Sequence, residues 1–187
     1  MDPLSDNELM MKVKSGDIAR LGLLFERHHR PLFGFFYRAT QQQALSEDLV
    51  QNVFEKILKN RKQFKGYGKF STWMFSIAHH ELADHFKRHS RRPDKAAMKQ
   101  DTEHKDHDPG FLEHELHRDE LNLLSAAMSR LDNEKRQLLA LSKGEGLSYR
   151  EIGEITGISE GAARVKVFRA LQELRSVYQQ IEKQLTS

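Results

Sequence analysis

The sequence has no cysteine and little proline or glycine. Its 187 residues include four prolines and 11 glycines. Without cysteine the chain cannot form a disulfide or a thiolate metal site, which agrees with a reducing compartment such as the cytoplasm. Few helix breakers and no convincing alternation of polar and apolar residues argue against strands. We therefore expect an all-α protein with one large domain or two small ones.

A long apolar run is also missing. No stretch approaches the roughly 18 consecutive apolar residues that a membrane-spanning helix needs. The first residues, MDPLSDNELMMKVKSGD, lack the apolar core of a signal peptide. Hydrophobic residues make up 38% of the chain and charged residues 30%, which fits a soluble protein with modest helical cores. We expect no membrane insertion and a cytoplasmic location.

The spacing of apolar residues predicts where the helices lie. Residues 18–40, 46–60 and 70–89 each repeat apolar side chains at helical intervals, after a short helix that ends near residue 14. Pro31 should kink the first of these three helices. The segment 93–118 is polar and holds two of the four prolines, so it is predicted to be a flexible linker. The predicted architecture is two small helical domains, 1–92 and 119–187, joined by residues 93–118.

The C-terminal domain contains a helix-turn-helix pattern between residues 147 and 175. Ser148 and Glu151 form an S-x-x-E capping box that begins the first helix. Gly157 provides a turn position of left-handed conformation, and Ser159 can cap the second helix. Such a unit places its second helix in the major groove of DNA. The net charge of +3 is a weak argument for nucleic acid, so the prediction rests on this local pattern.

The second helix of this unit has an apolar and a basic face. At 100° per residue, one face carries Ala163, Val167, Ala170, Leu171 and Leu174 and is predicted to be core. Val165, Phe168 and Arg169 lie opposite, flanked by Arg164 and Lys166. Arginine binds guanine in bidentate fashion, and an exposed Phe168 would fit a thymine methyl group. The alternative is that Phe168 packs on a neighbouring helix and the arginines are solvated.

A second basic cluster occurs between residues 62 and 92. Its lysines and arginines are interleaved with six aromatic residues, which suits a single nucleic-acid strand whose bases stack on rings. Those rings are Phe64, Tyr67, Phe70, Trp73, Phe75 and Phe86. The alternative, which we favour for Trp73 and Phe86, is that the rings form the domain core.

Four segments together resemble the extracytoplasmic-function (ECF, group 4) sigma factors of bacterial RNA polymerase. They are LGLLFERHHRPLFGFFYRAT (21–40), SEDLVQNVFEKILKN (46–60), FKGYGKFSTWMFSIAHHELADHFKRHSRR (64–92) and SRLDNEKRQLLALSKGEGLSYREIGEITGISEGAARVKVFRALQELR (129–175). The order and spacing of these segments, with the E-D-L-V-Q and F-x-T-W-x-F-x-I-A strings, make the match specific.

The resemblance implies both partners and residues. A sigma factor binds core RNA polymerase and promoter DNA, as duplex and as melted non-template strand, and an anti-sigma factor commonly inhibits it. The implied polymerase contacts are Asp48, Gln51, Asn52 and Glu55. One base of the minus-ten element is flipped into a pocket, and the implied contacts with this element are Lys69, His79, His80, Glu81, Lys87, Arg88, Arg91 and Arg92. The implied minus-thirty-five contacts are Ser159, Arg164, Val165, Lys166, Phe168 and Arg169.

Two other functions are open on the residues alone. A conventional helix-turn-helix transcriptional regulator would share the C-terminal domain, but it would not need the 48–55 segment. Ten histidines raise the possibility of a metal-responsive protein. His85 follows His80 at i+5 instead of the i+4 of a zinc H-E-x-x-H helix, however, and no third ligand is fixed. We predict no metal, no cofactor and no enzymatic activity.

Overall fold

The computed structural model describes residues 4–90 and 111–185, and every regular element in these two ranges is a helix. The all-α prediction is confirmed. In chain order the elements are α1 (Asp6–Ser15), α2 (Arg20–Thr40), α3 (Gln43–Lys59), the 3₁₀ turn η1 (Arg61–Gln63), α4 (Phe70–Ser90), α5 (Phe111–Ser129), α6 (Asn133–Leu139), the π-helical turn η2 (Ala140–Gly144), α7 (Tyr149–Thr156) and α8 (Glu160–Leu185).

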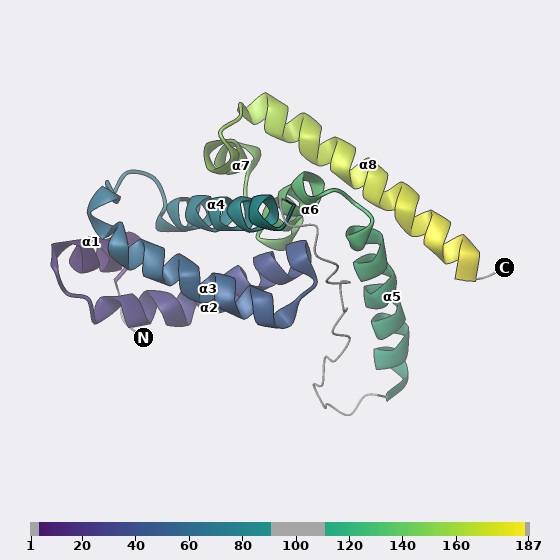
Figure 1. The fold of residues 1–187 in the computed structure, drawn as a ribbon, viewed down its shortest axis with the longest axis horizontal. Helices are drawn as coiled ribbons and strands as arrows, with labels where there is room; N and C mark the ends of the chain where they lie inside the picture. Colours follow the sequence, from purple (N-terminus) through teal and green to yellow (C-terminus); the bar gives the residue numbers. More distant parts are fainter. Residues whose placement is uncertain (1–3, 91–110, 186–187) are drawn as a thin grey trace.

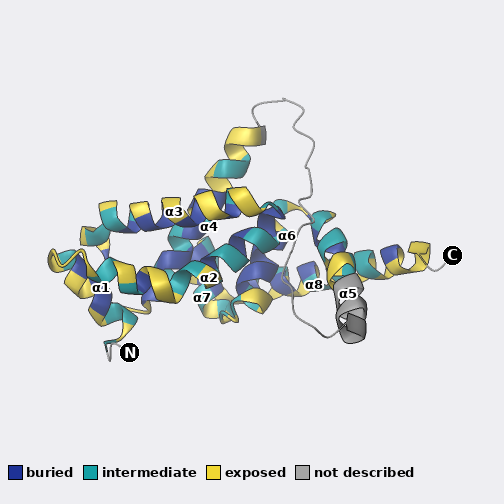
Figure 2. Ribbon diagram, turned by 90° about the horizontal axis from the view of Figure 1, so that it is seen from below, coloured by how far each residue is buried: buried dark blue, intermediate teal, exposed yellow. Residues whose placement is uncertain are grey.

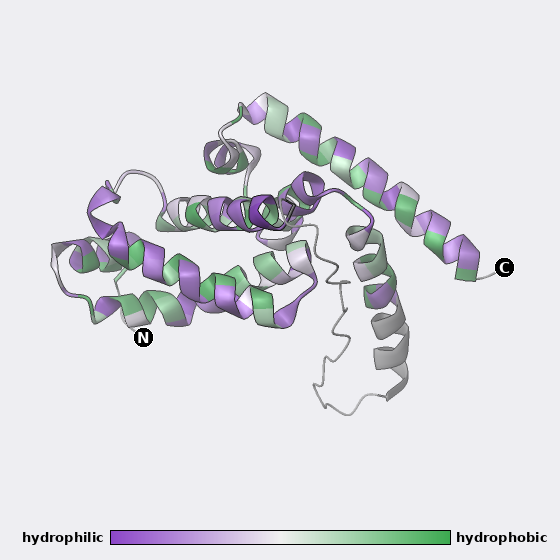
Figure 3. Ribbon diagram, in the orientation of Figure 1, coloured by the Kyte–Doolittle hydropathy of each residue, from purple (hydrophilic) through white to green (hydrophobic). Residues whose placement is uncertain are grey.

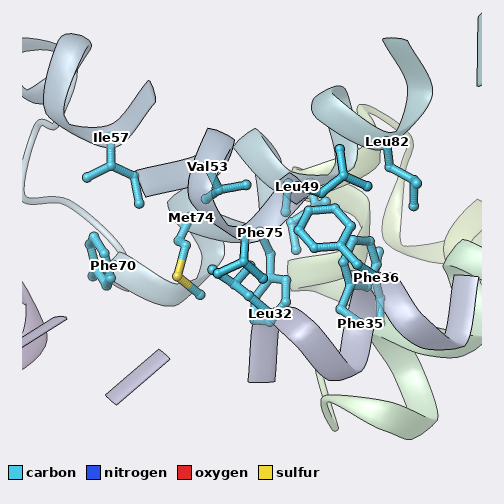
Figure 4. Packing of buried hydrophobic residues seen from close by; sticks show 14 of the residues in the cluster. Leu32, Phe35, Phe36, Leu49, Val53, Ile57, Phe70, Met74, Phe75 and Leu82 are labelled. Carbon is cyan, nitrogen blue, oxygen red and sulfur yellow. The ribbon is translucent and has the colours of Figure 1, made fainter. Parts of the chain in front are cut away.

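The N-terminal domain is built around α2, α3 and α4, with α1 against one end (Figure 1). Its core is rich in large side chains, which face inward from all three helices (Figure 4). The rings of Phe35 and Phe75 meet edge to face with centroids 5.7 Å apart. Helix α2 continues through Pro31 and ends at Gln41, which adopts the left-handed region at φ +57°. The rings of Phe25 in α2 and Phe54 in α3 also meet edge to face, at 4.9 Å. Helix α2 thus holds both α3 and α4, the two helices that carry most of the predicted contacts of this domain.

The C-terminal domain contains the helix-turn-helix as predicted. The Ser148 hydroxyl accepts a hydrogen bond from the N–H of Glu151, whose carboxylate accepts one from the N–H of Ser148 at 2.9 Å. Gly157 ends α7 in the left-handed region at φ +74°. The hydroxyl of Ser159 accepts from the N–H of Ala162 at 3.2 Å, which caps α8. Helix α5 packs against α8, whose ribbon alternates between apolar green and polar purple along its length in Figure 3.

The linker differs from the prediction at its C-terminal end. Helix α5 begins at Phe111, so the last part of the 93–118 segment is helical. Periodicity detects a helix through its apolar face, and the spacing that supported this helix begins only at Leu121. Arg91 and Arg92 lie outside the described residues.

The two domains pack directly against each other. Helix α7 lies on α4, while α6 and η2 lie on α2 (Figure 1). Buried side chains from both domains belong to one continuous apolar cluster, which extends from Leu24 in α2 to Ile152 in α7 and Val167 in α8. In Figure 2 the buried residues line the inner faces of α2 and α4. The sequence did not predict this contact between the domains.

Candidate nucleic-acid interface

Helix α3 presents a polar stripe to solvent. Asp48, Gln51, Asn52 and Glu55 are all exposed, and their i, i+3, i+4 and i+7 spacing places them on one face. The opposite face is held in the core by residues such as Val53. Glu55 makes only a loose ion pair with Lys59, at 3.6 Å. The four predicted polymerase contacts therefore form one continuous, accessible surface.

A groove of about 500 Å³ separates α3 from α4. Its lining joins two of the predicted polymerase contacts to three of the predicted DNA contacts. The residues are Asn52, Glu55, Lys56 and Lys59 from α3, and Glu81, Asp84, Lys87 and Arg88 from α4. The polymerase stripe and the basic end of α4 are thus neighbouring surfaces.

His79, His80 and Glu81 point in different directions. Consecutive helical residues are turned by about 100°, so these three side chains cannot share one face. His80 is exposed, and its Nδ1 lies 2.6 Å from the Ser76 carbonyl oxygen. Glu81 is only 4% exposed and is ion-paired with Lys56 of α3. Here Glu81 joins α3 to α4 and is turned away from the surface that His80 presents.

His79 faces the C-terminal domain. It lines a cavity of about 360 Å³ between α4, α6 and α7, together with Gln137 and Glu134 of α6. Burial lowers the pKa of the imidazole, aided by the neighbouring His80, while Gln137 and Glu134 act in the opposite direction. The buried atoms His79 Nδ1 and Gln137 Oε1 have no hydrogen-bond partner within the described part of the chain. His79 is therefore covered in this arrangement, whereas His80 is not.

Lys69 also reaches across to the C-terminal domain. Its Nζ lies 2.8 Å from a carboxylate oxygen of Glu151. This contact, together with hydrogen bonds from the Ser148 hydroxyl and backbone, lowers the pKa of Glu151 to about 2. Glu151 thus serves both the capping box of α7 and the contact between the domains, while the Lys69 side chain remains 74% exposed.

The aromatic set of the N-terminal domain separates into core and surface. Phe64, Phe70 and Phe75 are buried, and Trp73 and Phe86 are partly buried against the core, as favoured for these two. Tyr67 is 88% exposed, between Gly66 and Gly68, which adopt φ values of +77° and +75°. This loop presents a free ring beside Lys65 and Lys69. The sequence did not distinguish Tyr67 from the other five aromatic residues of the basic cluster. Its position between two glycines, with a lysine on either side, was the signal that could have marked it as exposed.

Helix α8 separates its faces as predicted. Ala163, Val167 and Ala170 are buried, whereas Val165 is 48% and Phe168 59% exposed. The alternative, in which Phe168 packs on a neighbouring helix, is therefore not supported. Arg169 is exposed, as are Ser159 and Arg164, which lies 3.7 Å from Glu160 and over the Tyr149 ring at 5.5 Å. Lys166 is half-buried and ion-paired with Glu134 of α6.

Within residues 4–90 and 111–185 no three His, Asp or Glu side chains are placed to hold a metal ion. None of the helices in these ranges is long and apolar enough to cross a membrane.

Two family models match the chain and divide it as the fold does. Residues 24–92 match sigma-70 region 2, and residues 121–174 match sigma-70 region 4. The sigma factor CarQ of Myxococcus xanthus is 33% identical over 165 residues, which cover 85% of this chain and 89% of that one. The chain belongs to the ECF sigma factors of bacterial RNA polymerase. As a sigma factor it directs promoter recognition and transcription initiation, and the conventional-regulator alternative is not favoured.

Other relatives agree with this membership. The ECF sigma-E factor of Haemophilus influenzae is 27% identical, over 95% of this chain and 97% of that protein. Among solved structures, CnrH in complex with the cytosolic domain of CnrY has a TM-score of 0.68 at 21% identity, over 92% of this sigma factor and 96% of that chain. RpoE of Bartonella quintana, in complex with the anti-sigma factor NepR, has a TM-score of 0.69 at 19% identity, over 84% and 96%. These two structures support the fold.

Gly153 gives a test of the helix-turn-helix geometry. A Cβ at this position would lie 2.6 Å from the backbone oxygen of Ile158, so α7 could not keep its distance from the turn. We expect Gly153→Ala to destabilise the C-terminal domain by about 1–3 kcal/mol. Gly161→Ala is the matched control, because a Cβ there meets nothing within 4 Å. Urea unfolding followed by circular dichroism measures both, and equal stability of the two variants would contradict this account of the turn.

Proposed function

We propose that this sigma factor binds core RNA polymerase through the exposed stripe Asp48, Gln51, Asn52 and Glu55 on α3. The observation that carries the proposal is the presentation of all four side chains on one solvent face of a helix anchored in the domain core. Such a polar stripe on a rigid helix suits specific docking, because little ordering is needed when the partner binds.

The minus-ten element is read by α4 and the loop before it. His80 is exposed at the middle of α4, and Lys87 and Arg88 line the groove at its C-terminal end. Exposed Tyr67 offers a ring on which a base of the melted strand can stack. Lys69 is exposed beside Tyr67 and belongs to this surface, whereas His79 faces the C-terminal domain and would join it only if that domain moved away. Glu81 is not among the proposed contacts with the minus-ten element, because its carboxylate is buried against Lys56.

The minus-thirty-five element is read by the outer face of α8. Arg164 and Arg169 supply donors for base edges or phosphates, and Phe168 and Val165 supply apolar contacts for thymine methyl groups. Ser159 lies at the start of the helix, where the recognition helix meets the DNA backbone. Lys166 reaches a phosphate only after it releases Glu134.

Promoter melting follows from capture of the exposed strand. Stacking and hydrogen bonds to an extruded base offset the free energy of unstacking, so no nucleotide hydrolysis by the sigma factor is required. In this proposal the polymerase, and not the sigma factor, catalyses RNA synthesis. The sigma factor acts in the cytoplasm, where polymerase and chromosome are found. An anti-sigma partner is also proposed, because CnrH and the Bartonella RpoE were solved with CnrY and NepR.

The docking stripe is tested by a charge reversal. Asp48→Arg should weaken binding to purified core polymerase about tenfold or more, as expected for a central interface position. Glu26→Arg makes the same charge change at an exposed residue of α2, outside the stripe on α3. Fluorescence anisotropy of the labelled sigma factor measures both affinities. Equal affinities of Asp48→Arg and wild type would remove α3 from the polymerase interface.

Promoter recognition is tested by transcription from a random promoter library with core polymerase. The wild-type chain should select two conserved boxes. Arg169→Ala should relax or weaken the upstream box by about 1–3 kcal/mol for each lost base contact. Arg175→Ala removes an equally exposed arginine farther along α8 and should leave the selected sequences unchanged. If no promoter is selected, or if both variants behave alike, the assignment of the recognition face fails.

A further inference from the structure

Two histidines stack on each other in the last turns of α4. His85 and His89 are four residues apart, so they share one face of the helix. Their ring centroids are 4.0 Å apart, and the ring planes are inclined by 30°. The other two histidines of α4, His79 and His80, have centroids 5.8 Å apart and rings turned by 76°. His85 and His89 are therefore the closer pair and the better suited to share one ion.

The ring of His89 is oriented by the backbone. Its Nδ1 lies 2.9 Å from the carbonyl oxygen of His85. A carbonyl oxygen can only accept a hydrogen bond, so in the neutral ring Nδ1 carries the proton and Nε2 keeps its lone pair. Histidines that bind metals in proteins usually donate their other ring N–H in this way. This hydrogen bond thus leaves Nε2 of His89 available to a metal ion.

Charge and distance at the pair both suit a metal ion. Partial burial lowers the pKa of the His85 imidazole, and so do the nearby His89 and Arg88, so the ring is neutral at physiological pH, as a metal ligand must be. Arg88 repels a cation, but the carbonyl end of α4, which finishes at Ser90, attracts one. Two nitrogens that share an ion at about 2.0–2.1 Å are at most about 4 Å apart. Rings with centroids 4.0 Å apart reach this limit by rotation of the side chains alone.

We propose that His85 and His89 form a two-imidazole site for a late first-row divalent metal ion, with copper favoured over nickel and zinc. Within residues 4–90 and 111–185 no third His, Asp or Glu is placed to complete a larger site, so water takes the remaining positions. Glu81, one turn before His85, is held by Lys56. The pair also differs from His80 and His85, whose i+5 spacing argued against a zinc helix. This site is independent of the proposed function, because neither promoter recognition nor polymerase docking requires a metal.

The site is tested by calorimetric titration with Cu²⁺ alone. The chain used has alanine in place of its four histidines between residues 104 and 117, so that their binding does not overlap with that of the pair. One ion should bind tightly per chain. His85→Ala or His89→Ala should weaken this binding about a hundredfold or more, because the second imidazole of a chelating pair binds intramolecularly. If either variant binds Cu²⁺ as tightly as its parent, the site does not exist.

His29 provides a matched control within the same domain. Its Nδ1 lies 2.9 Å from the carbonyl oxygen of Phe25, and its ring stacks on the Phe25 ring with centroids 5.1 Å apart. The local arrangement is that of His89, but the ring one turn earlier cannot bind a metal. His29→Ala should therefore leave the Cu²⁺ titration unchanged, and Mg²⁺ should not bind at the pair, because it prefers oxygen ligands. Equal losses in His29→Ala and His89→Ala, or equal binding of Mg²⁺, would overturn the proposal.

Nuclear magnetic resonance of the unsubstituted chain locates the ion directly. Paramagnetic Cu²⁺, added below one equivalent, broadens the imidazole proton signals of the residues that bind it. The signals of His85 and His89 should lose intensity well before that of His29. Because His89 is exposed, His89→Ala should keep the circular dichroism of the parent chain while its titration changes. Equal broadening of His29 and the pair would contradict a chelating site at the end of α4.

Discussion

Helix α4 lies between α3 and the C-terminal domain, and the 100° step between its residues divides its side chains among these neighbours. Phe75 and Leu82 enter the core, Glu81 pairs with Lys56 of α3, and His79 turns toward α6. Only the remaining arc, with His80 and the basic end, stays exposed. The surface that α4 offers to DNA is thus determined by what packs on it.

At the contact between the domains, the carboxylate of Glu151 interacts with groups of both domains. Glu151 completes the capping box of α7 through Ser148 and also receives Lys69. If Lys69 leaves for a phosphate, Glu151 keeps its backbone and hydroxyl partners. The start of α7 is therefore capped by its own residues, whatever group Lys69 contacts. Lys166 is likewise ion-paired with Glu134 of α6, and a DNA phosphate would have to displace Glu134 to bind it.

Local signals in the sequence predicted the local structure well. The capping box at Ser148, the turn at Gly157 and the buried and exposed faces of α8 follow from spacing alone, because each involves residues within one or two helical turns. Family resemblance added the stripe on α3. The contact between the domains could not be predicted from the sequence. Arg38 and Glu145, which form one of its ion pairs, are 107 positions apart, and helical periodicity carries no information on such distant pairs. The helical step of about 100° per residue explains why His79 and Glu81, both predicted to contact the minus-ten element, lie on different faces.

The packing of the two domains affects the two DNA-reading surfaces unequally. Val165, Phe168 and Arg169 remain exposed on α8, whereas His79 lines the cavity between the domains. Lys69 pairs with Glu151 but keeps a side chain that is 74% exposed. Recognition of intact duplex by α8 needs no strand separation, but the minus-ten pocket is useful only when a base has left the stack. In this arrangement the outer face of α8 is fully presented, whereas His79, one of the proposed minus-ten contacts, faces the C-terminal domain. The packing of the two domains thus decides which of the proposed DNA contacts on α4 lie at the surface.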